Sequence, residues 1–337
     1  MKLIVLTKQF GNYTGATVST IEILKRISKQ FDEVNVITLK SENIRIDNVT
    51  VQIAKSYRDL VKKVKKIKAK NLIGYSDDHL GFIFSFCNIR YIHTYHGNWP
   101  DAKYLNKQMY FKSFYFIPLY RMTIKRADFV VSVSQYMQKK FVNKYNDKSI
   151  VIFNGIKQVN HNFSKKNIDN KQRFLMVGNI DKRKYDKAIK IFYILNKYNF
   201  DKSIDIYGNL IDEKLAFNLK KYPFVKIKGM VDKVDYQNYD AMICTSASEN
   251  LPVSIVESII SGVPVLSFNV GGIPEVIENK INGYLFSVND YLGFSNSILN
   301  FKNLEIPTKN IKSINSKFNW DNSAKKYYQI LKKVLEN

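Results

Sequence analysis

Short apolar runs typical of buried strands alternate with longer segments of helical periodicity along this sequence. The run KLIVL at 2–6 is followed by a glycine-bearing loop, a helical pattern at 17–31 and the run VNVITL at 34–39. Such alternation indicates βαβ units, in which successive strands are parallel and the connecting helices cover the sheet. Further strands are predicted at 71–75, 90–96, 129–134 and 149–153. The sequence therefore predicts an α/β fold built on parallel sheets.

A polar stretch at 157–172 interrupts this alternation and has the composition of a linker between domains. The alternation then restarts, with the apolar runs RFLMVG, SIDIYG, VKIKG, AMICTS and PVLSF and helical patterns among them. Residues 319–337 form an amphipathic pattern and are predicted to be a helix. A chain of 337 residues is long enough for two domains, so we predict one on each side of the linker.

The chain contains no stretch of about eighteen consecutive apolar residues, so the sequence predicts no transmembrane helix. The apolar run at the N-terminus is shorter than a signal peptide requires, which indicates a cytoplasmic protein. The two cysteines, Cys87 and Cys244, lie far apart without any metal-ligand spacing. Both stand among apolar residues and are predicted to be buried thiols.

The formal net charge of +24 is the most unusual feature of the composition. It favours anionic partners, which include nucleic acid, an anionic membrane surface and phosphate-bearing substrates. The alternative is that lysines only decorate the solvated surface. Composition by itself leaves both explanations open.

Residues 240–286 contain the most informative pattern of the chain. A buried strand ends in the polar loop SASEN, Pro252 suits the first turn of the next helix, and Gly262 suits its C-terminal cap. A second buried strand ends in NVGGIPE, which is predicted to open another helix. Ligands of open α/β sheets bind where parallel strands end, and helix N-termini there attract phosphate. Gly271 and Gly272 lack a Cβ atom and would let a ligand approach the backbone.

Within this segment Glu249 and Glu257 are separated by seven residues. The block ENLPVSIVESIISGVPVLSFNVGGIPEVIENKINGYLF resembles the signature region of family 4 glycosyltransferases, retaining enzymes of the GT-B fold that carry an E-x7-E motif. The resemblance extends over most of the chain and is strongest in its C-terminal half. It implies two Rossmann-like domains that face each other across a cleft. The acceptor-side domain would be 1–156 with a C-terminal helix at about 318–337, and the nucleotide-sugar domain would be 172–317.

The resemblance also implies roles for individual residues of this block. Glu249 would contact hydroxyl groups of the donor sugar and act as a catalytic residue. Glu257 would accept hydrogen bonds from the ribose of the nucleotide, since a carboxylate is a natural acceptor for paired hydroxyls. Other donor-binding positions would lie around the helix entrance and the following glycine turn: Asn250, Leu251, Val253 and Gly272.

A second stretch, FLMVGNIDKRKYDKAI, resembles the family's strand, glycine and basic loop, in which cations clamp the diphosphate. Gly178 and Lys184 match that pattern, as a donor-binding and a catalytic residue. Asn179 and Tyr185 depart from it, because the family often has arginine and glycine at these places. The second cation of the clamp would be one of two neighbours, Lys182 or the candidate donor-binding residue Arg183.

Two stretches of the N-terminal half also resemble the family. TKQFGNYTGATVS resembles its glycine-rich first loop, with Gly11 and Gly15 separated where the family usually has paired glycines. Gly15 would approach the donor phosphates or the acceptor. YIHTYHGNWP resembles the strand-end histidine motif, in which His96 would be a catalytic residue that contacts the donor sugar or the acceptor. His93 points to the opposite face of the strand and is the weaker candidate, and a core histidine is the alternative.

The implied reaction moves a sugar, of the hexosyl or N-acetylhexosaminyl class, from a nucleoside diphosphate to an acceptor hydroxyl with retention of configuration. The nucleotide is taken to be UDP on the family pattern. The chain has no D-x-D spacing, which holds a divalent cation in other glycosyltransferases, so we expect neither a metal nor a cofactor. Lys184, neighbouring cations and helix N-termini would instead stabilise the departing phosphate.

Two segments bear on the acceptor side. Residues 55–70 form a strongly basic, amphipathic helical pattern, and residues 103–126 interleave aromatic side chains with lysine and arginine. This composition suits the headgroup zone of an anionic membrane. We expect peripheral attachment to the inner membrane face and a glycan or lipid-linked acceptor, in cell-surface polysaccharide or glycoconjugate synthesis. Ordinary helices with a solvated basic side are the alternative.

Three competing functions stay open. A basic nucleic-acid-binding protein would fit the charge, but no such module is recognisable, and we expect no nucleic-acid partner. A catalytically silent relative that acts as a partner or scaffold would fit the altered clamp loop. Another enzyme of the same fold, a sugar phosphorylase or an epimerase, is distinguished by the product, since the transferase releases UDP rather than sugar phosphate.

Overall fold

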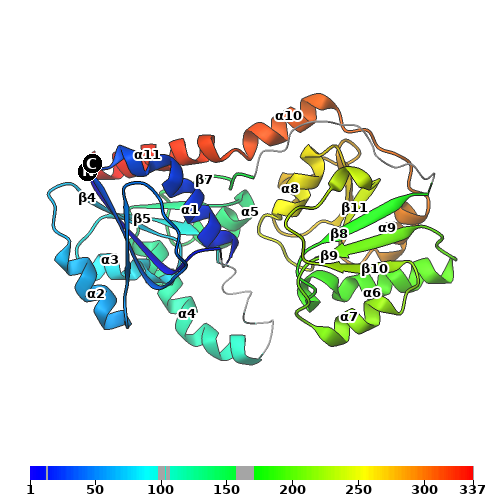
Figure 1. Ribbon diagram of the computed structural model, residues 1–337, viewed down its shortest axis with the longest axis horizontal. Coiled ribbons are helices and arrows are strands. Elements are labelled where there is room, and N and C mark those ends of the chain that lie inside the picture. Colours follow the sequence, from blue (N-terminus) through cyan, green and yellow to red (C-terminus); the bar gives the residue numbers. More distant parts are fainter. Residues whose placement is uncertain (13, 98–102, 104–106, 157–170, 337) are drawn as a thin grey trace. The chain divides into compact units, whose positions relative to one another are not determined.

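The computed structural model describes residues 1–12, 14–97, 103, 107–156 and 171–336 (Figure 1). The chain divides into two compact units, which we call the first domain (Met1–Gly155 with Phe318–Asn337) and the second domain (Ile156–Lys317). Most of the predicted linker at 157–172 lies outside the described residues. Each domain contains a parallel sheet covered by helices, which confirms the predicted α/β class with two Rossmann-like domains.

The first domain is built on a seven-stranded sheet with the order β3-β2-β1-β4-β5-β6-β7, in which every pairing is parallel. Its strands are β1 Lys2–Phe10, β2 Glu33–Ser41, β3 Val49–Ile53, β4 Leu72–Ser76, β5 Tyr91–Tyr95, β6 Phe129–Ser132 and β7 Ser149–Val151. Strand β3 was not predicted. It lies at the edge of the sheet and is only partly buried, so it lacks the continuous apolar run of a central strand.

Side chains of the first sheet alternate between two cores, because successive residues of a strand point to opposite faces. Leu3 and Val5 pack in one core, and Ile4 and Leu6 pack in the other. The first core is covered by α1 Gly15–Ile27 and α11 Trp320–Glu336. The second core is covered by α2 Tyr57–Lys66, α3 Phe82–Phe86, α4 Lys107–Arg126, α5 Gln135–Met137 and the π-helical turn Gln138–Val142. Short 3-10 turns occupy Ser28–Gln30 and His79–Gly81.

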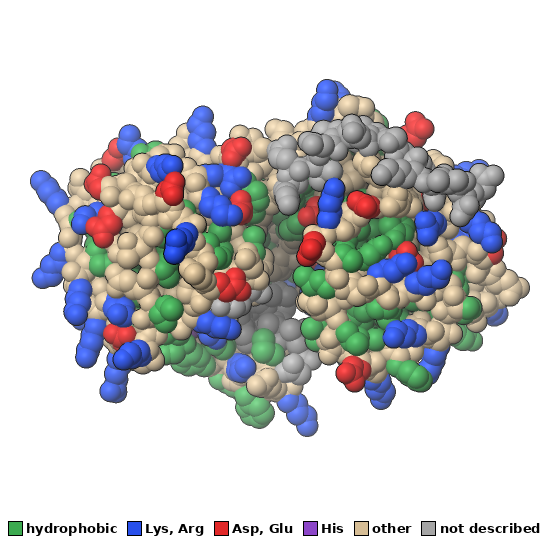
Figure 2. All heavy atoms as spheres, viewed as in Figure 1, with side chains coloured by type: hydrophobic (Ala, Val, Ile, Leu, Met, Phe, Trp, Pro, Cys, Tyr) green, Lys and Arg blue, Asp and Glu red, His purple; other side chains and the backbone are tan. Residues whose placement is uncertain are grey.

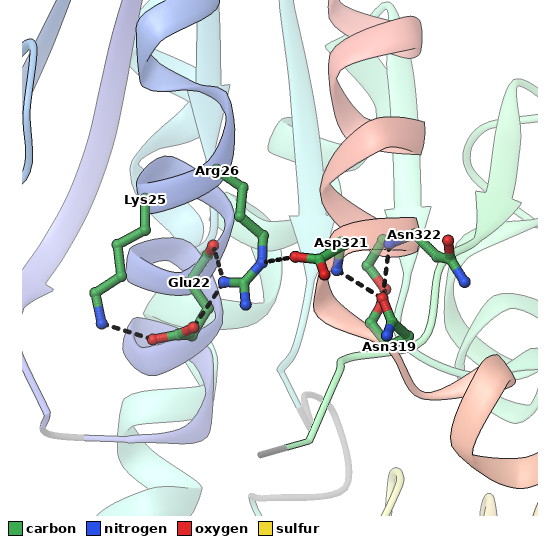
Figure 3. Close-up of polar contacts among 7 residues, drawn as sticks. Glu22, Lys25, Arg26, Asn319, Asp321 and Asn322 are labelled. Atoms are coloured by element: carbon green, nitrogen blue, oxygen red, sulfur yellow. Dashed lines mark hydrogen bonds and ion pairs between the residues drawn. The ribbon is translucent and has the colours of Figure 1, made fainter. Parts of the chain in front are cut away.

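The helix predicted at the C-terminus is present as α11 and packs against α1. Its buried side is apolar and contributes Leu331 and Val334 to the core it shares with α1. At the exposed edge of this contact, the Arg26 guanidinium lies between the carboxylates of Glu22 and Asp321 (Figure 3). The Asn319 side chain accepts hydrogen bonds from backbone N–H groups of the first turn of α11 and so caps it.

The second domain is built on a six-stranded parallel sheet with the order β10-β9-β8-β11-β12-β13. Its strands are β8 Arg173–Val177, β9 Ser203–Tyr207, β10 Val225–Gly229, β11 Ala241–Cys244, β12 Val265–Phe268 and β13 Gly283–Phe286. Its helices are α6 Lys182–Lys197, α7 Glu213–Lys220, α8 Val253–Ile260, α9 Tyr291–Leu299 and α10 Thr308–Lys317, with 3-10 turns at Tyr236–Asn238 and Ile273–Glu275.

In both sheets the strand order reverses direction next to the first strand, between β1 and β4 in one and between β8 and β11 in the other. In doubly wound folds the loops that leave the two strands at such a reversal turn to opposite sides of the sheet and open a crevice at its carboxyl edge. Ligands of doubly wound folds bind in that crevice. The loops after β1, β4, β8 and β11 are therefore where the candidate site is to be sought.

The structure corrects three local predictions. Pro252 is the residue that precedes α8, with extended backbone angles, and does not lie in the first turn. NVGGIPE opens only the 3-10 turn Ile273–Glu275, because Gly272 and the next turn close back on the chain. Cys87 is half-buried at the end of α3, whereas Cys244 is buried as predicted. Gly262 follows α8 with φ +77°, which confirms the glycine cap.

Candidate functional site

Three loops of the second domain meet at the carboxyl edge of its sheet: those after β8, β11 and β12. The loop after β8 contains Gly178, whose φ of +146° favours glycine. A Cβ atom at this position would lie 2.5 Å from the Lys184 Nζ atom. The lysine side chain therefore folds back over Gly178, and a larger residue at position 178 would clash with it.

The Glu249 carboxylate lies among polar partners although its residue is only 8% exposed. Its Oε1 atom accepts a hydrogen bond of 2.8 Å from the Ser246 hydroxyl. The same oxygen lies 3.3 Å from Arg183 Nη1 and 3.5 Å from Lys184 Nζ. A buried carboxylate needs such compensation, because desolvation of an unpaired charge is costly. The three residues thus form a compact cluster of one anion and two cations.

Hydrogen bonds fasten the first turn of α6 to the loop after β11. Arg183 Nη1 donates to the Ser248 carbonyl at 2.8 Å, and the Ala247 N–H donates to the Arg183 carbonyl at 2.8 Å. The Thr245 hydroxyl donates to the Lys184 carbonyl at 2.6 Å. Two segments more than sixty residues apart in sequence are held in register by these contacts, so the cation pair and Glu249 keep a fixed spacing.

The structure distinguishes the two candidates for the second cation, because Arg183 joins the cluster whereas Lys182 is exposed to solvent. Asn179 is exposed as well. Tyr185 is buried in the core, and its hydroxyl donates to the Gly178 carbonyl at 3.1 Å. The departure from glycine at this place is therefore accommodated by packing under the loop, away from the cations.

The glycine turn after β12 supports the Glu249 backbone. Gly271 has φ +59°, and a Cβ atom there would lie 1.7 Å from the Glu249 carbonyl oxygen. The Gly272 N–H donates to that same carbonyl at 3.0 Å. The sequence predicted that a ligand approaches the backbone of this turn. Its nearest neighbour in the structure is instead the backbone of Glu249. A donor contact by Gly272 stays a prediction.

The remaining predicted donor-binding residues lie at the start of α8. Asn250 and Leu251 are half-buried, and Val253 is exposed in the first turn. Glu257 is half-buried on the same helix, and its Oε2 atom accepts a hydrogen bond of 2.9 Å from the Tyr236 hydroxyl. Burial raises the pKa of Glu257, and the Tyr236 hydrogen bond opposes that effect. Sequence reasoning missed Tyr236, because it lies outside the glutamate block.

The first domain has a cavity of about 280 Å³ where β1, β4 and β5 end and α1 begins. His96 lines it, together with Thr14, Ala16 and Thr17 around the exposed Gly15. Burial lowers the pKa of His96 to about 4, so its imidazole is neutral near pH 7. A neutral ring can both donate and accept a hydrogen bond, which suits contact with a hydroxyl group.

His93 lies apart from this cavity. It is fully buried within β5, and its Nδ1 atom is 2.9 Å from the Ser76 hydroxyl. His93 is therefore a core histidine. His96 lines the cavity, which is the position that a ligand-contacting residue needs.

Two acidic residues of this cavity were not predicted. Asp77 and Asp78 follow β4, and Asp77 is only 4% exposed. Thr20 donates to Asp77 Oδ2 at 2.7 Å, while Oδ1 has no partner within the described part of the chain. Burial raises the pKa of both carboxyl groups, and the negative charge of Asp78 raises the pKa of Asp77 further. The polar triplet SDD directly after a predicted strand was the signal that could have identified them.

The described ranges of the chain contain no group of three or more His, Cys, Asp or Glu side chains that could hold a metal ion. The absence of a metal requirement stays a prediction. No helix among the described residues is long and apolar enough to cross a bilayer.

Two family models match the sequence. The model described as "Glycosyl transferases group 1" matches residues 158–318, and the one described as "Glycosyltransferase Family 4" matches residues 13–158. An uncharacterized glycosyltransferase of Methanocaldococcus jannaschii is 26% identical over 238 residues, which are 61% of this chain and 60% of that protein. The chain thus spans less than two thirds of that relative.

Solved structures of similar fold cover nearly the whole chain. The Anabaena protein HepE in complex with UDP and glucose has a TM-score of 0.73 at 16% identity, over 98% of this chain and 99% of that one. The lipopolysaccharide outer core galactosyltransferase WaaB has a TM-score of 0.72 at 15% identity, over 99% of this chain and 100% of that one. At these identities the likeness shows the fold alone.

Proposed function

This chain belongs to the family 4, or group 1, glycosyltransferases of the GT-B fold, and from that membership we propose that it transfers a sugar from a nucleoside diphosphate sugar to an acceptor hydroxyl. The observation that carries the proposal is the cluster of Glu249, Arg183 and Lys184 at the carboxyl edge of the second sheet. Two cations beside one carboxylate supply what a sugar diphosphate needs, namely charge for its phosphates and an acceptor for its hydroxyls.

The cluster has a specific chemical task in this proposal. Glu249 compensates both cations in the structure. The diphosphate of the donor takes over that pairing, and Glu249 is then available to accept hydrogen bonds from sugar hydroxyls. Negative charge accumulates on the phosphate as the glycosidic bond breaks, so fixed cations stabilise the transition state more than the ground state.

The proposed chemistry retains the anomeric configuration. The bond from the anomeric carbon to the phosphate oxygen breaks, and the acceptor oxygen bonds to the same face of that carbon. The departing phosphate takes the proton of the acceptor hydroxyl, so no protein nucleophile is assigned. Lys184 and Arg183 hold the phosphate, and His96 contacts the donor sugar or the acceptor.

The donor is proposed to be a UDP-sugar of the hexosyl or N-acetylhexosaminyl class. Support comes from the similar fold of the Anabaena protein HepE, which was solved in complex with UDP and glucose. Glu257 would bind the ribose hydroxyls, with Tyr236 orienting the carboxylate through its hydrogen bond. The acceptor is proposed to be a glycan or a lipid-linked glycan of the cell surface, and the similar fold of a lipopolysaccharide galactosyltransferase supports that class.

The proposal is tested first by donor binding. UDP-sugars and GDP-sugars are screened by thermal shift, since a ligand of the native state raises the apparent stability. A UDP-sugar is expected to raise the melting temperature of the wild type and to raise that of a Glu257→Ala variant less. Glu213→Ala, an exposed glutamate on α7, is the matched control and should behave as the wild type.

Product analysis completes the test. UDP release measured with a cell-surface glycan acceptor, and the anomeric configuration of the product by NMR, report the reaction and its stereochemistry. An inverted product would contradict retention. Release of a sugar phosphate instead of UDP would indicate a phosphorylase.

A further inference from the structure

The first half of α4 exposes aromatic rings on successive turns. The exposed fractions are 48% for Tyr110, 71% for Phe111, 67% for Phe114 and 53% for Tyr115. The ring centroids of Tyr110 and Phe114 are 5.5 Å apart, so these rings form a contiguous patch. An exposed cluster of large apolar side chains marks an interaction site, because isolated exposed rings are common and clusters are rare.

Cations surround this aromatic patch. Helix α4 contains no acidic residue in its twenty positions. It carries exposed basic side chains along its whole length: Lys107, Lys112, Arg121, Lys125 and Arg126. We call these cations and the four exposed rings the α4 surface. In Figure 2 hydrophobic side chains lie interspersed with Lys and Arg side chains over the lower part of α4.

Neighbouring elements extend the charge of the α4 surface. Helix α3 packs against α4, and its Phe86 ring, 62% exposed, lies 5.8 Å below the Arg126 guanidinium. Tyr57 at the start of α2 lies near Tyr115. Burial raises the pKa of Tyr57, and the Tyr115 phenol raises it further. Exposed cations continue along α2: Arg58, Lys62, Lys65 and Lys66.

Helices α2 and α4 differ in what they can offer to a partner. The apolar side of α2, with Leu60 and Val64, is fully buried in the core. This helix is therefore a core helix whose basic side faces solvent. Its lysines can meet anionic headgroups, but only the rings of α4 are available to enter the apolar zone.

We propose that the α4 surface docks on an anionic lipid bilayer, with the Phe111 and Phe114 rings inserted at the boundary between headgroups and acyl chains and the α2 lysines on the headgroups. On α4 the aromatic rings are framed by cations, and the helix has no carboxylate. This arrangement matches a bilayer surface, in which anionic headgroups border an apolar zone. The bilayer is the occupant because it offers apolar and anionic zones side by side over a wide area. This inference rests on the proposed function in one respect, because docking would give the enzyme access to a lipid-linked acceptor.

Vesicle co-sedimentation at low salt tests the proposal on the full chain. The vesicles contain equal amounts of phosphatidylcholine and phosphatidylglycerol, with phosphatidylcholine alone as the comparison. The wild type is expected to bind the mixed vesicles and to dissociate as salt screens the charges. A Phe111→Ser, Phe114→Ser double variant should partition at least about tenfold less, because two large rings no longer leave water. A Lys62→Gln variant should lose about fivefold, the share of one cation near an anionic surface.

Phe217→Ser is the matched control, since Phe217 on α7 of the second domain is 65% exposed and lies outside the α4 surface. It should bind vesicles as the wild type does. All four residues are exposed, so thermal melting should show unchanged folding. Equal vesicle binding by the double phenylalanine variant and the wild type, or no binding by the wild type at low salt, would overturn the proposal.

UDP binding by each variant separates this inference from the proposed function. If the α4 surface is a docking site, the phenylalanine variant loses vesicle binding and keeps its UDP affinity. Absent vesicle binding with normal UDP binding would refute the docking alone. Normal vesicle binding in a protein that binds no nucleotide would refute the proposed function and leave the docking intact.

Discussion

Replacing Glu249 by glutamine should have opposite effects on nucleotide binding and on sugar transfer. The carboxylate lies 3.3 Å from Arg183 Nη1 and 3.5 Å from Lys184 Nζ. In the proposed mechanism UDP displaces it from these cations. Glutamine keeps the size of the side chain and an acceptor for the Ser246 hydroxyl, but it removes the competing charge. UDP alone should therefore bind the variant more tightly.

The size of the effect follows from the exposure of the pairs. The side chains of Arg183 and Lys184 are 29% and 19% exposed, so their attraction to Glu249 is partly screened by water. Pairs of this kind contribute at most about 1 kcal/mol each. We take a net gain of about 1 kcal/mol, which is a roughly fivefold lower Kd for UDP. Transfer should fall by about ten- to a hundredfold, since a hydrogen bond from a sugar hydroxyl to a charged group contributes about 1.5–3 kcal/mol.

Isothermal titration with UDP and a UDP-release assay measure the two effects on the same preparations. Glu213→Gln, an exposed glutamate in the first turn of α7, is the charge-matched control and should change neither. Weaker or unchanged UDP binding by the Glu249→Gln variant would refute the competition between carboxylate and diphosphate. Undiminished transfer would remove Glu249 from the catalytic residues.

Three further predictions concern the supporting structure. Tyr236→Phe should weaken UDP binding about fivefold, because Glu257 loses the hydrogen bond that orients its carboxylate, an indirect effect of about 1 kcal/mol. On acidification, UDP binding by this variant should fail at a higher pH than in the wild type, because the Glu257 pKa rises further without that bond. Gly271→Ala should lower the free energy of unfolding by about 1–3 kcal/mol, since its Cβ atom has no room, whereas Gly15→Ala, with open space around it, should not; urea denaturation measures both. Burial lowers the pKa of His93 to about 3 while the unfolded residue titrates near 6.5, so the unfolded state alone binds the proton between these values and stability should fall as the pH drops through that window. A melting temperature that shows the same acid dependence in a His93→Gln variant would contradict this last prediction.

Much of the fold could be predicted from local pattern. Buried parallel strands are continuous apolar runs, so β1, β2, β8 and β12 stand out in the sequence. Strand β3 could not be found in this way, because an edge strand is only partly buried and its residues alternate in polarity. The 3-10 turn after Gly272 was missed for a related reason, since the length of a helix depends on what packs against its far end.

The candidate site was predictable where its residues form a contiguous motif. Glu249 and Glu257 belong to one block, and Gly178 and Lys184 belong to another. Tyr236 could not be assigned from the sequence, and the SDD triplet marked Asp77 only as a polar residue that follows a strand. Their significance lies in the partners they meet, Glu257 for the tyrosine and the first-domain cavity for the aspartate.

The sequence by itself determined that this chain folds into two parallel α/β domains and that its glutamate block lies where strands end, because both follow from the spacing of residues near one another. Only the tertiary structure decided that Arg183 rather than Lys182 joins Glu249, and that the rings of α4 stay exposed while the apolar side of α2 is buried. The physical reason is that such contacts join residues far apart in sequence. Their meeting depends on which strands become neighbours and on which helix face the sheet covers.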